Sequence, residues 1–149
     1  MRIVYWNYRG LGNPEKVEAV KYLMKMEPTN ILLLQETKIE GDALLEINKN
    51  KWQKNAGKAI SARGYSGGIA TPWKEDQFKL VSSSNTQHWS FTKLKHIESK
   101  LIFALFNVYV PVLYSEKKEC WKTLNEFLEL HSPNNIIIGG DLNLVMNAK

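Results

Sequence analysis

Five polar residues stand at the ends of apolar runs, and their types suit a site for a divalent cation. Asn7 follows the first apolar run directly, and Glu36 follows the second. Tyr109 lies near the end of a third run, while Asp141 and Asn143 follow a fourth. In open α/β sheets, ligands gather at the carboxyl ends of strands. Carboxylate and amide oxygens are hard ligands that suit Mg²⁺ or Mn²⁺ and do not suit zinc. A cation would also remove the repulsion between two neighbouring carboxylates.

Each of these residues also has an ordinary structural explanation. Asn7 and Asn143 are of a type that favours turns after strands. Glu36 can be an exposed loop carboxylate, and Asp141 can favour a turn. Tyr109 can be a half-buried core residue with its hydroxyl in water. The pattern alone leaves the metal site and these explanations open.

The histidines and the single cysteine form no recognisable catalytic or metal-binding motif. His88 and His96 lie in or near predicted strands, and His131 ends a predicted helix, where it can meet the negative end of the helix dipole. We expect all three to be structural. Cys120 is the only cysteine, which excludes a disulfide partner within the chain and a Cys-based zinc site. We therefore expect a packed thiol and an intracellular location.

Positive charge is concentrated in one segment. Residues 47–74 contain six basic residues and no acidic one, whereas the rest of the chain carries fourteen basic and fifteen acidic residues. The segment also contains Trp52, and this combination suits a polyanion such as DNA. A solvated, lysine-rich loop explains the charge equally well. The candidate nucleic-acid-binding residues are Lys49, Lys51, Lys54, Lys58 and Arg63.

The first part of the chain predicts a strand–helix–strand unit that would position Asn7 and Glu36. Ile3–Trp6 has the pattern of a strand, and Asn13 and Pro14 suit the start of a helix. Ile31–Leu34 is continuously apolar, as expected of a strand covered on both faces. Such a unit predicts a parallel pair of strands.

The remaining pattern predicts a single α/β domain, residues 1–149, with mixed sheets. No apolar stretch is long enough to span a membrane, and the N-terminus lacks the apolar segment of a secretory signal. The further elements are a helix over 42–48, strands over 66–70, 78–81, 89–94 and 101–110, a helix over 115–131, and a buried strand over 136–138 that Gly139 and Gly140 end.

Five motifs, in a fixed order, carry a resemblance to a known family. They are WNYRGLG from Trp6, LQETK from Leu34, SGGIA from Ser66, NVYVP from Asn107 and GGDLN from Gly139. With them the chain resembles the endonuclease/exonuclease/phosphatase superfamily. It is most similar to the endonuclease domain of plant non-LTR (LINE-type) retrotransposons. The resemblance implies part of a four-layer α/β sandwich of the deoxyribonuclease-I-like fold, with mixed sheets flanked by helices.

The resemblance also implies a role for each residue at the strand ends. Glu36 matches the main Mg²⁺-binding carboxylate, and Asn7 matches a residue that helps to hold the metal and the phosphate. Tyr109 matches a tyrosine whose hydroxyl contacts the scissile phosphate. Asp141 matches the aspartate that orients or deprotonates the attacking water, and Asn143 matches its partner. These roles agree with the needs of phosphodiester cleavage, which are an activated water and positive charge near the non-bridging oxygens.

The family pattern continues beyond this chain, which ends at Lys149. In the family, further strands bring another acidic residue and a terminal Ser-Asp-His motif. The resemblance therefore implies an N-terminal part of the domain, with turnover impaired or lost. It also implies uncovered sheet edges, which favour self-association or partner binding.

Three hypotheses follow. The first is a Mg²⁺-dependent DNA-nicking endonuclease domain of a retroelement, which would act in the nucleus. The second is a catalytically dead remnant that still binds metal or nucleic acid. The third is a fragment that acts only through protein contacts. An abasic-site nuclease or a phosphatase of the same superfamily is a further alternative, because the same strand-end site would serve each of them.

Overall fold

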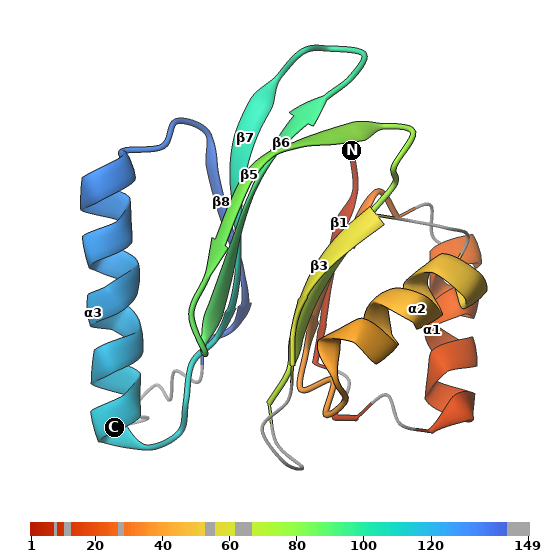
Figure 1. The fold of residues 1–149 in the computed structure, drawn as a ribbon, viewed down its shortest axis with the longest axis horizontal. Coiled ribbons are helices and arrows are strands. Elements are labelled where there is room, and N and C mark those ends of the chain that lie inside the picture. Colours follow the sequence, from red (N-terminus) through yellow and green to blue (C-terminus); the bar gives the residue numbers. More distant parts are fainter. Residues whose placement is uncertain (8, 11–12, 27–28, 53–55, 62–66, 143–149) are drawn as a thin grey trace, which may run out of the picture.

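The computed structural model contains two four-stranded sheets that face each other (Figure 1). It describes residues 1–7, 9–10, 13–26, 29–52, 56–61 and 67–142. The first sheet has the order β1-β2-β4-β3, with strands β1 (Ile3–Asn7), β2 (Ile31–Gln35), β4 (Ile69–Trp73) and β3 (Ala56–Ile60). The second has the order β5-β6-β7-β8, with strands β5 (Phe78–Asn85), β6 (Trp89–His96), β7 (Ile102–Tyr109) and β8 (Ile136–Asp141).

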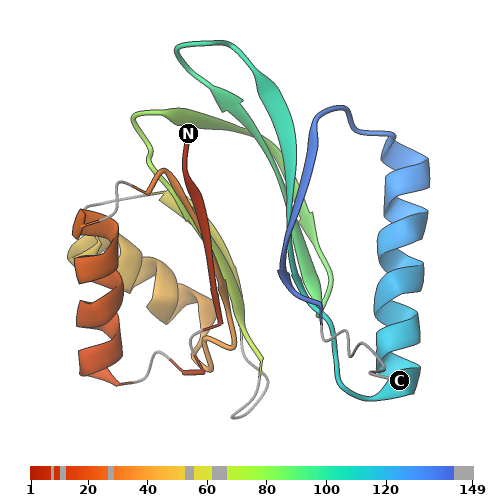
Figure 2. The ribbon, with the colours of Figure 1, turned by 180° about the vertical axis from the view of Figure 1, so that it is seen from behind.

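Helices cover the outer faces of both sheets and complete four layers. Helices α1 (Pro14–Met26) and α2 (Gly41–Lys51) lie on the first sheet, and α3 (Tyr114–His131) lies on the second (Figures 1 and 2). The predicted layered α/β fold with mixed sheets is therefore confirmed. Within the described residues, no helix has the length and hydropathy that a membrane crossing requires.

Each sheet contains one parallel pair of strands. Strand β1 pairs with β2 in parallel, as the sequence predicted, and β7 pairs with β8 in parallel. A helix lies between the two strands of each pair along the chain, α1 in the first and α3 in the second. The start of α1 is also as predicted, because the Asn13 side chain accepts a hydrogen bond from the Glu15 amide at 2.9 Å.

The core consists of three apolar layers. Between α1, α2 and the first sheet, Trp52 is 1% exposed and donates its indole N–H to the Val17 carbonyl oxygen. Between the sheets, Leu33 and Leu105 belong to a second buried cluster. Strand β2 is buried throughout, which explains its continuously apolar sequence. Trp52 is therefore a core residue, and its presence in the basic segment is not evidence for contact with nucleic acid.

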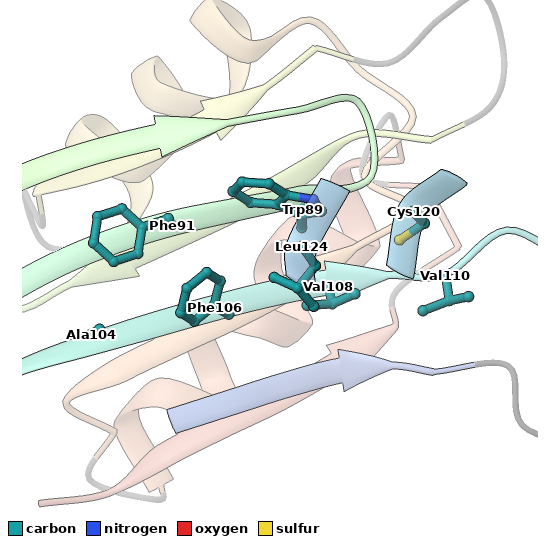
Figure 3. Packing of buried hydrophobic residues seen from close by; sticks show 8 residues of the cluster. All are labelled: Trp89, Phe91, Ala104, Phe106, Val108, Val110, Cys120 and Leu124. Carbon is teal, nitrogen blue, oxygen red and sulfur yellow. The ribbon is translucent and has the colours of Figure 1, made fainter. Parts of the chain in front are cut away.

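The third layer joins β6 and β7 to α3 (Figure 3). Trp89, Phe91 and Phe106 project from the two strands toward α3, and Phe127 of the helix lies 4.8 Å from Phe91 between ring centroids. Such aromatic contacts add to the free energy gained by burial. This layer fixes the end of β7, where Tyr109 stands.

The strand predicted over 66–70 is β4, Ile69–Trp73, and residue 66 lies outside the described residues. Two further elements differ more from the sequence prediction. Strand β8 was expected to be buried and to end before its glycines, yet Ile136 and Ile138 are 43% and 45% exposed and the strand runs on to Asp141. The reason is that β8 is the last strand in its sheet order, so one face and one edge lack a neighbour among the described residues. Strand β3 was not predicted, because Gly57 and Lys58 interrupt its apolar pattern.

Candidate active site

Four of the five predicted residues meet at one end of the sandwich, in two hydrogen-bonded pairs. The Tyr109 hydroxyl donates to Glu36 Oε1 at 2.6 Å. Asn7 Nδ2 donates to Asp141 Oδ2 at 3.1 Å. The fifth residue, Asn143, lies outside the described residues. Each hydrogen bond crosses from the first sheet to the second, so the site exists only when the two sheets are packed together.

Strand register explains why these side chains meet. In the first sheet, Asn7 stands opposite Gln35, the residue before Glu36. In the second sheet, Tyr109 stands opposite Asp141. Because the two strands of each pair are parallel, their carboxyl ends lie together at one end of their sheet. The rule that functional residues gather at the carboxyl ends of strands therefore holds within each sheet. The packing of the two sheets then brings the two sets of strand ends together.

The segment that carries Glu36 is held by backbone hydrogen bonds on both sides. Glu36 has a left-handed φ of 53°, and its carbonyl oxygen accepts from the Gly10 amide at 2.7 Å. The Thr37 amide donates to the Gly68 carbonyl oxygen at 3.2 Å. Gly68 has a φ of +93°, and a Cβ there would stand 2.1 Å from Thr37 Oγ1. Two of the sequence motifs thus supply the glycines that fix the Glu36 loop.

The electrostatic environment favours a protonated Tyr109. Burial, the hydrogen bond to Glu36 and the charges of Glu36 and Asp141 raise the pKa of Tyr109 well above its usual value of 10.0. The positive charge of Arg9 acts in the opposite direction and lowers that pKa. Burial, Asp141 and Glu36 also raise the pKa of Tyr5. The two carboxylates therefore create a negative potential around the phenols, which is an environment that attracts a cation.

The donor set fits a hard divalent cation such as Mg²⁺. Asn7 gives its amide N–H to Asp141, and its buried Oδ1 atom has no hydrogen-bond partner in the described structure. An orphaned amide oxygen on a side chain that contacts the Asp141 carboxylate is a ready oxygen ligand. Among the described residues, no group of three or more His, Cys, Asp or Glu side chains gathers to form a metal cage. Mg²⁺ does not need one, since it is usually bound by one or two carboxylates with water and phosphate.

A cavity of about 400 Å³ opens next to the site, and its lining includes polar residues that were not predicted as site residues, Gln87 and His88 among them. Glu36 and Tyr109 line it together with Lys38, Gln87 and His88. The His88 carbonyl oxygen accepts from the Tyr109 amide at 2.8 Å. Antiparallel pairing could have revealed these residues, because the start of β6 must lie beside the end of β7. His88, expected to be structural, thus lines the same cavity as the candidate catalytic pair.

Two of the predicted basic residues, Lys49 and Lys51, lie away from these four side chains. Lys49 and Lys51 are in the last turn of α2, whereas the first residue of that helix, Gly41, bonds to Ser61 at the cavity wall. With a rise of 1.5 Å per residue, the far end of α2 stands about 15 Å along the helix from that contact. Lys58 lies exposed within β3. Lys54 and Arg63 fall outside the described residues. The DNA-binding role of the four lysines and Arg63 stays a prediction.

Comparisons with solved structures define the fold class. The human Nocturnin catalytic domain with bound sulfate superposes with a TM-score of 0.73 at 17% identity, covering 97% of this chain and 64% of that one. An endonuclease/exonuclease/phosphatase family protein from Bacteroides thetaiotaomicron gives 0.74 at 14% identity, covering 99% and 65%. D. rerio TDP2 complexed with a single-strand DNA product gives 0.68 at 18% identity, covering 97% and 61%. No family model and no curated protein matches the sequence.

These likenesses show that the chain has the fold of endonuclease/exonuclease/phosphatase proteins, the deoxyribonuclease-I-like fold. The chain spans less than two thirds of the length of each of these three structures. Fold alone does not determine a reaction, which has to be argued from the site.

Proposed function

We propose that the chain is the metal-binding part of a Mg²⁺-dependent phosphodiester hydrolase of the endonuclease/exonuclease/phosphatase superfamily. The observation that carries the proposal is the convergence of Asn7, Glu36, Tyr109 and Asp141 across the two sheets. Their residue types, their place at the carboxyl ends of strands and the orphaned Asn7 oxygen are together what such a site needs. The likeness to nuclease and phosphatase structures supports the same conclusion.

In this proposal, Glu36 and Asn7 Oδ1 would hold the cation, which supplies positive charge to offset the developing charge on the phosphate. Asp141 orients an attacking water and accepts its proton as the new bond to phosphorus forms and the bond to the leaving oxygen breaks. The leaving oxygen takes a proton from solvent. The Asn7 amide fixes the Asp141 carboxylate through the 3.1 Å hydrogen bond. Tyr109 stays protonated because its pKa is raised, and its O–H can donate to a non-bridging phosphate oxygen.

For the substrate, we propose DNA and, more narrowly, the DNA-nicking role of a LINE-type retroelement endonuclease acting in the nucleus. The WNYRGLG and LQETK motifs support the retroelement endonucleases. D. rerio TDP2, which has the same fold, is complexed with a single-strand DNA product. An abasic-site nuclease or a phosphatase is the second candidate, since the fold is shared with both nucleases and phosphatases. A third candidate is a binding module without turnover, for which the exposed Lys49, Lys51 and Lys58 would supply the charge.

The test is nicking of supercoiled plasmid DNA by the 149-residue chain with Mg²⁺, alongside EDTA and an Asp141→Ala variant. Because the resemblance implies impaired turnover, we expect only weak formation of open-circle product, which both controls abolish. Cleavage that survives EDTA and the variant would contradict the proposal. DNA retention without cleavage, weakened steeply by salt and by Lys49→Ala with Lys51→Ala, would favour the binding module.

A further inference from the structure

The outer face of the second sheet is only partly covered by α3. Side chains alternate along β6, which places Lys93 and Lys95 on the same face as Phe91. The register between β6 and β7 is continuous, so no bulge breaks this alternation. Helix α3 packs on Phe91 through Phe127. The turn of the β6–β7 hairpin lies beyond the end of α3, and Lys95 is the second residue before that turn begins (Figure 1).

Three lysines come together on this part of the sheet. Lys79 of β5 stands directly opposite Lys95 of β6 in the antiparallel register. Residues directly opposite one another have Cβ atoms about 4.5–5.5 Å apart. Lys93 precedes Lys95 by two residues, or about 7 Å along β6. Lys79 is exposed and the other two are half-buried. We call Lys79, Lys93 and Lys95 the β5–β6 lysine face.

The β5–β6 lysine face carries an excess of positive charge. Residues 78–96 contain these three lysines and no acidic residue. With the flanking turns, residues 74–100 contain five lysines and three acidic residues, which are Glu75, Asp76 and Glu98. Lys79 also lines a cavity together with Lys58 and Glu75. None of the three lysines makes an ion pair with a residue that the structure describes, the exposed glutamates of α3 included.

Protection of a sheet edge explains only one of these lysines. Lysine on an edge strand opposes pairing with another chain, and this accounts for Lys79, because β5 is the last strand in its sheet order. Lys93 and Lys95 lie on β6, an inner strand between β5 and β7, where no edge needs protection. Like charges directly opposite one another also destabilise a sheet. A polyanion bound to the face would offset that repulsion.

The chemistry of the face favours a row of phosphate groups. Ser82 stands opposite Lys93, and Ser84 stands opposite Phe91, so both serines share the outer face with the lysines. Both serines are exposed. Lysine and serine side chains are common partners of phosphate oxygens in nucleic-acid complexes. A nucleic-acid strand presents its phosphates as a continuous row of charges, which matches lysines spaced along and across two strands.

We propose that the β5–β6 lysine face is a second nucleic-acid-binding surface, which binds a phosphate backbone without reading its sequence. Lys95 stands opposite Ile102, and Tyr109 lies seven residues further along β7. At about 3.4 Å per residue, the face begins about 24 Å from the candidate active site. It therefore anchors a segment of nucleic acid apart from the one at the site. The inference goes beyond the proposed function, and its choice of nucleic acid rests on that function.

The test measures binding of a short fluorescein-labelled DNA duplex by anisotropy over a series of salt concentrations, in EDTA so that no cation contributes. Lys93→Gln with Lys95→Gln removes two charges from the face. Lys118→Gln with Lys122→Gln, at exposed positions on α3, removes the same charge and is the matched control. We expect the face variant to weaken binding by roughly tenfold at low salt. Its slope of log K against log salt should be less steep by about 1.8, because each phosphate contact contributes about 0.9. The control should change neither quantity.

The Tm separates lost binding from lost folding. Replacing Lys95 relieves its repulsion with Lys79, so the Tm of the face variant should not fall below that of wild type. Weak binding together with an unchanged or higher Tm supports the surface.

The possible results also separate this inference from the proposed function. Equal weakening by the two double variants would overturn the surface, because it would reflect net charge alone. Unchanged binding by the face variant, or no binding by wild type in EDTA, would overturn the surface while the plasmid-nicking assay still decides the proposed function. Displacement of the DNA by poly-glutamate at equal charge concentration would overturn the choice of nucleic acid and point to an acidic protein. Lysine-dependent binding without any nicking would support the surface and count against the hydrolase.

Discussion

Two hydrogen bonds and one unpartnered oxygen atom define the candidate cation site at the residue scale. The two hydrogen bonds, Tyr109 to Glu36 and Asn7 to Asp141, use side chains far apart in the chain and leave one amide oxygen of Asn7 without a partner. A buried polar atom without a partner costs free energy, and the cation proposed for this site would satisfy the Asn7 oxygen. Backbone positions beside these residues are constrained just as tightly.

At the residue scale, Gly140→Ala should be among the most damaging substitutions near the site. Gly140 has a φ of +136°, and a Cβ would stand 1.9 Å from the Val108 carbonyl oxygen. The clash lies between β7 and β8 and cannot relax without separating the strands that carry Tyr109 and Asp141. We expect a loss of more than about 3 kcal/mol in the free energy of unfolding, measured by urea denaturation.

Gly67→Ala is the matched control. Gly67 also has a positive φ, +77°, but a Cβ there meets nothing within 4 Å. We expect the free energy of unfolding to fall by only about 1–2 kcal/mol, which is the cost of the backbone strain. Equal effects of the two substitutions would show that the close approach of β7 and β8 does not constrain the site.

At the element scale, a buried amide network joins the two sheets just behind the site. Asn107 of β7 is fully buried, and its Nδ2 group lies within hydrogen-bond distance of the Ala70 carbonyl oxygen, at 2.9 Å, and of Thr71 Oγ1, at 3.2 Å. Its side-chain oxygen accepts a hydrogen bond from Gln35, the residue before Glu36. Asn107 stands two residues before Tyr109, so this network sets the distance between the strands that carry Glu36 and Tyr109.

Asn107→Leu should therefore destabilise the sandwich. The substitution removes the partners of several buried polar groups at once, for an expected loss of about 2–4 kcal/mol in the free energy of unfolding. Asn125→Leu, at an exposed position on α3, should change it by less than about 0.5 kcal/mol. Urea unfolding of both variants makes the comparison. Similar small effects would mean that the sheets are held by apolar packing alone.

Cys120 of α3 makes the stability of the α3 layer depend on pH. The thiol is 0% exposed, and burial raises its pKa from 9.0 to about 11. The folded state thus favours the neutral thiol, so its contribution is fully present below pH 9 and is lost as the pH rises toward 11. Urea midpoints between pH 7 and 11 should fall more steeply for wild type than for Cys120→Ala. Parallel curves would contradict the burial of this thiol.

The elements were predicted from sequence more fully than the site. The apolar patterns of the buried strand β2 and the amphipathic helix α3 predict both elements. The position of β3 and the exposure of β8 depend on neighbouring strands, which the local sequence does not indicate. Asn7, Glu36, Tyr109 and Asp141 could be found because each directly follows or ends an apolar run. Gln87 and His88 were not predicted, because their place beside Tyr109 follows only from the antiparallel register of β6 and β7. The role of Asn107 arises from contact between the two sheets, which no local pattern contains.

At the scale of the whole molecule, the strands nearest the site are also edge strands. Strands β1 and β8 end their sheets in the described structure, and Tyr5, Ile136 and Ile138 on them are each 43–45% exposed. Unpaired edges with apolar side chains favour pairing with another chain. Asn7 and Asp141 of the candidate site thus lie on the same two strands that form the open edges.

We expect the chain to self-associate through these edges. Sedimentation velocity should show a species larger than the monomer that grows with concentration. Ile138→Lys should reduce it, because a charged side chain on an edge opposes pairing. Leu130→Lys, at an exposed position on α3 and not on an edge strand, should not. A monomer at every concentration would contradict the expectation.

Binding of Mn²⁺, followed by electron paramagnetic resonance, tests the central claim most directly, because it reads the cation site without requiring turnover. Wild type and the variant Glu40→Gln, which alters an exposed carboxylate four residues from Glu36, should bind one Mn²⁺ ion with the same affinity. Glu36→Gln should weaken that binding by roughly tenfold or more, since it removes the main anionic ligand. Equal binding by Glu36→Gln and Glu40→Gln would show that the cation does not lie where the four strand ends meet.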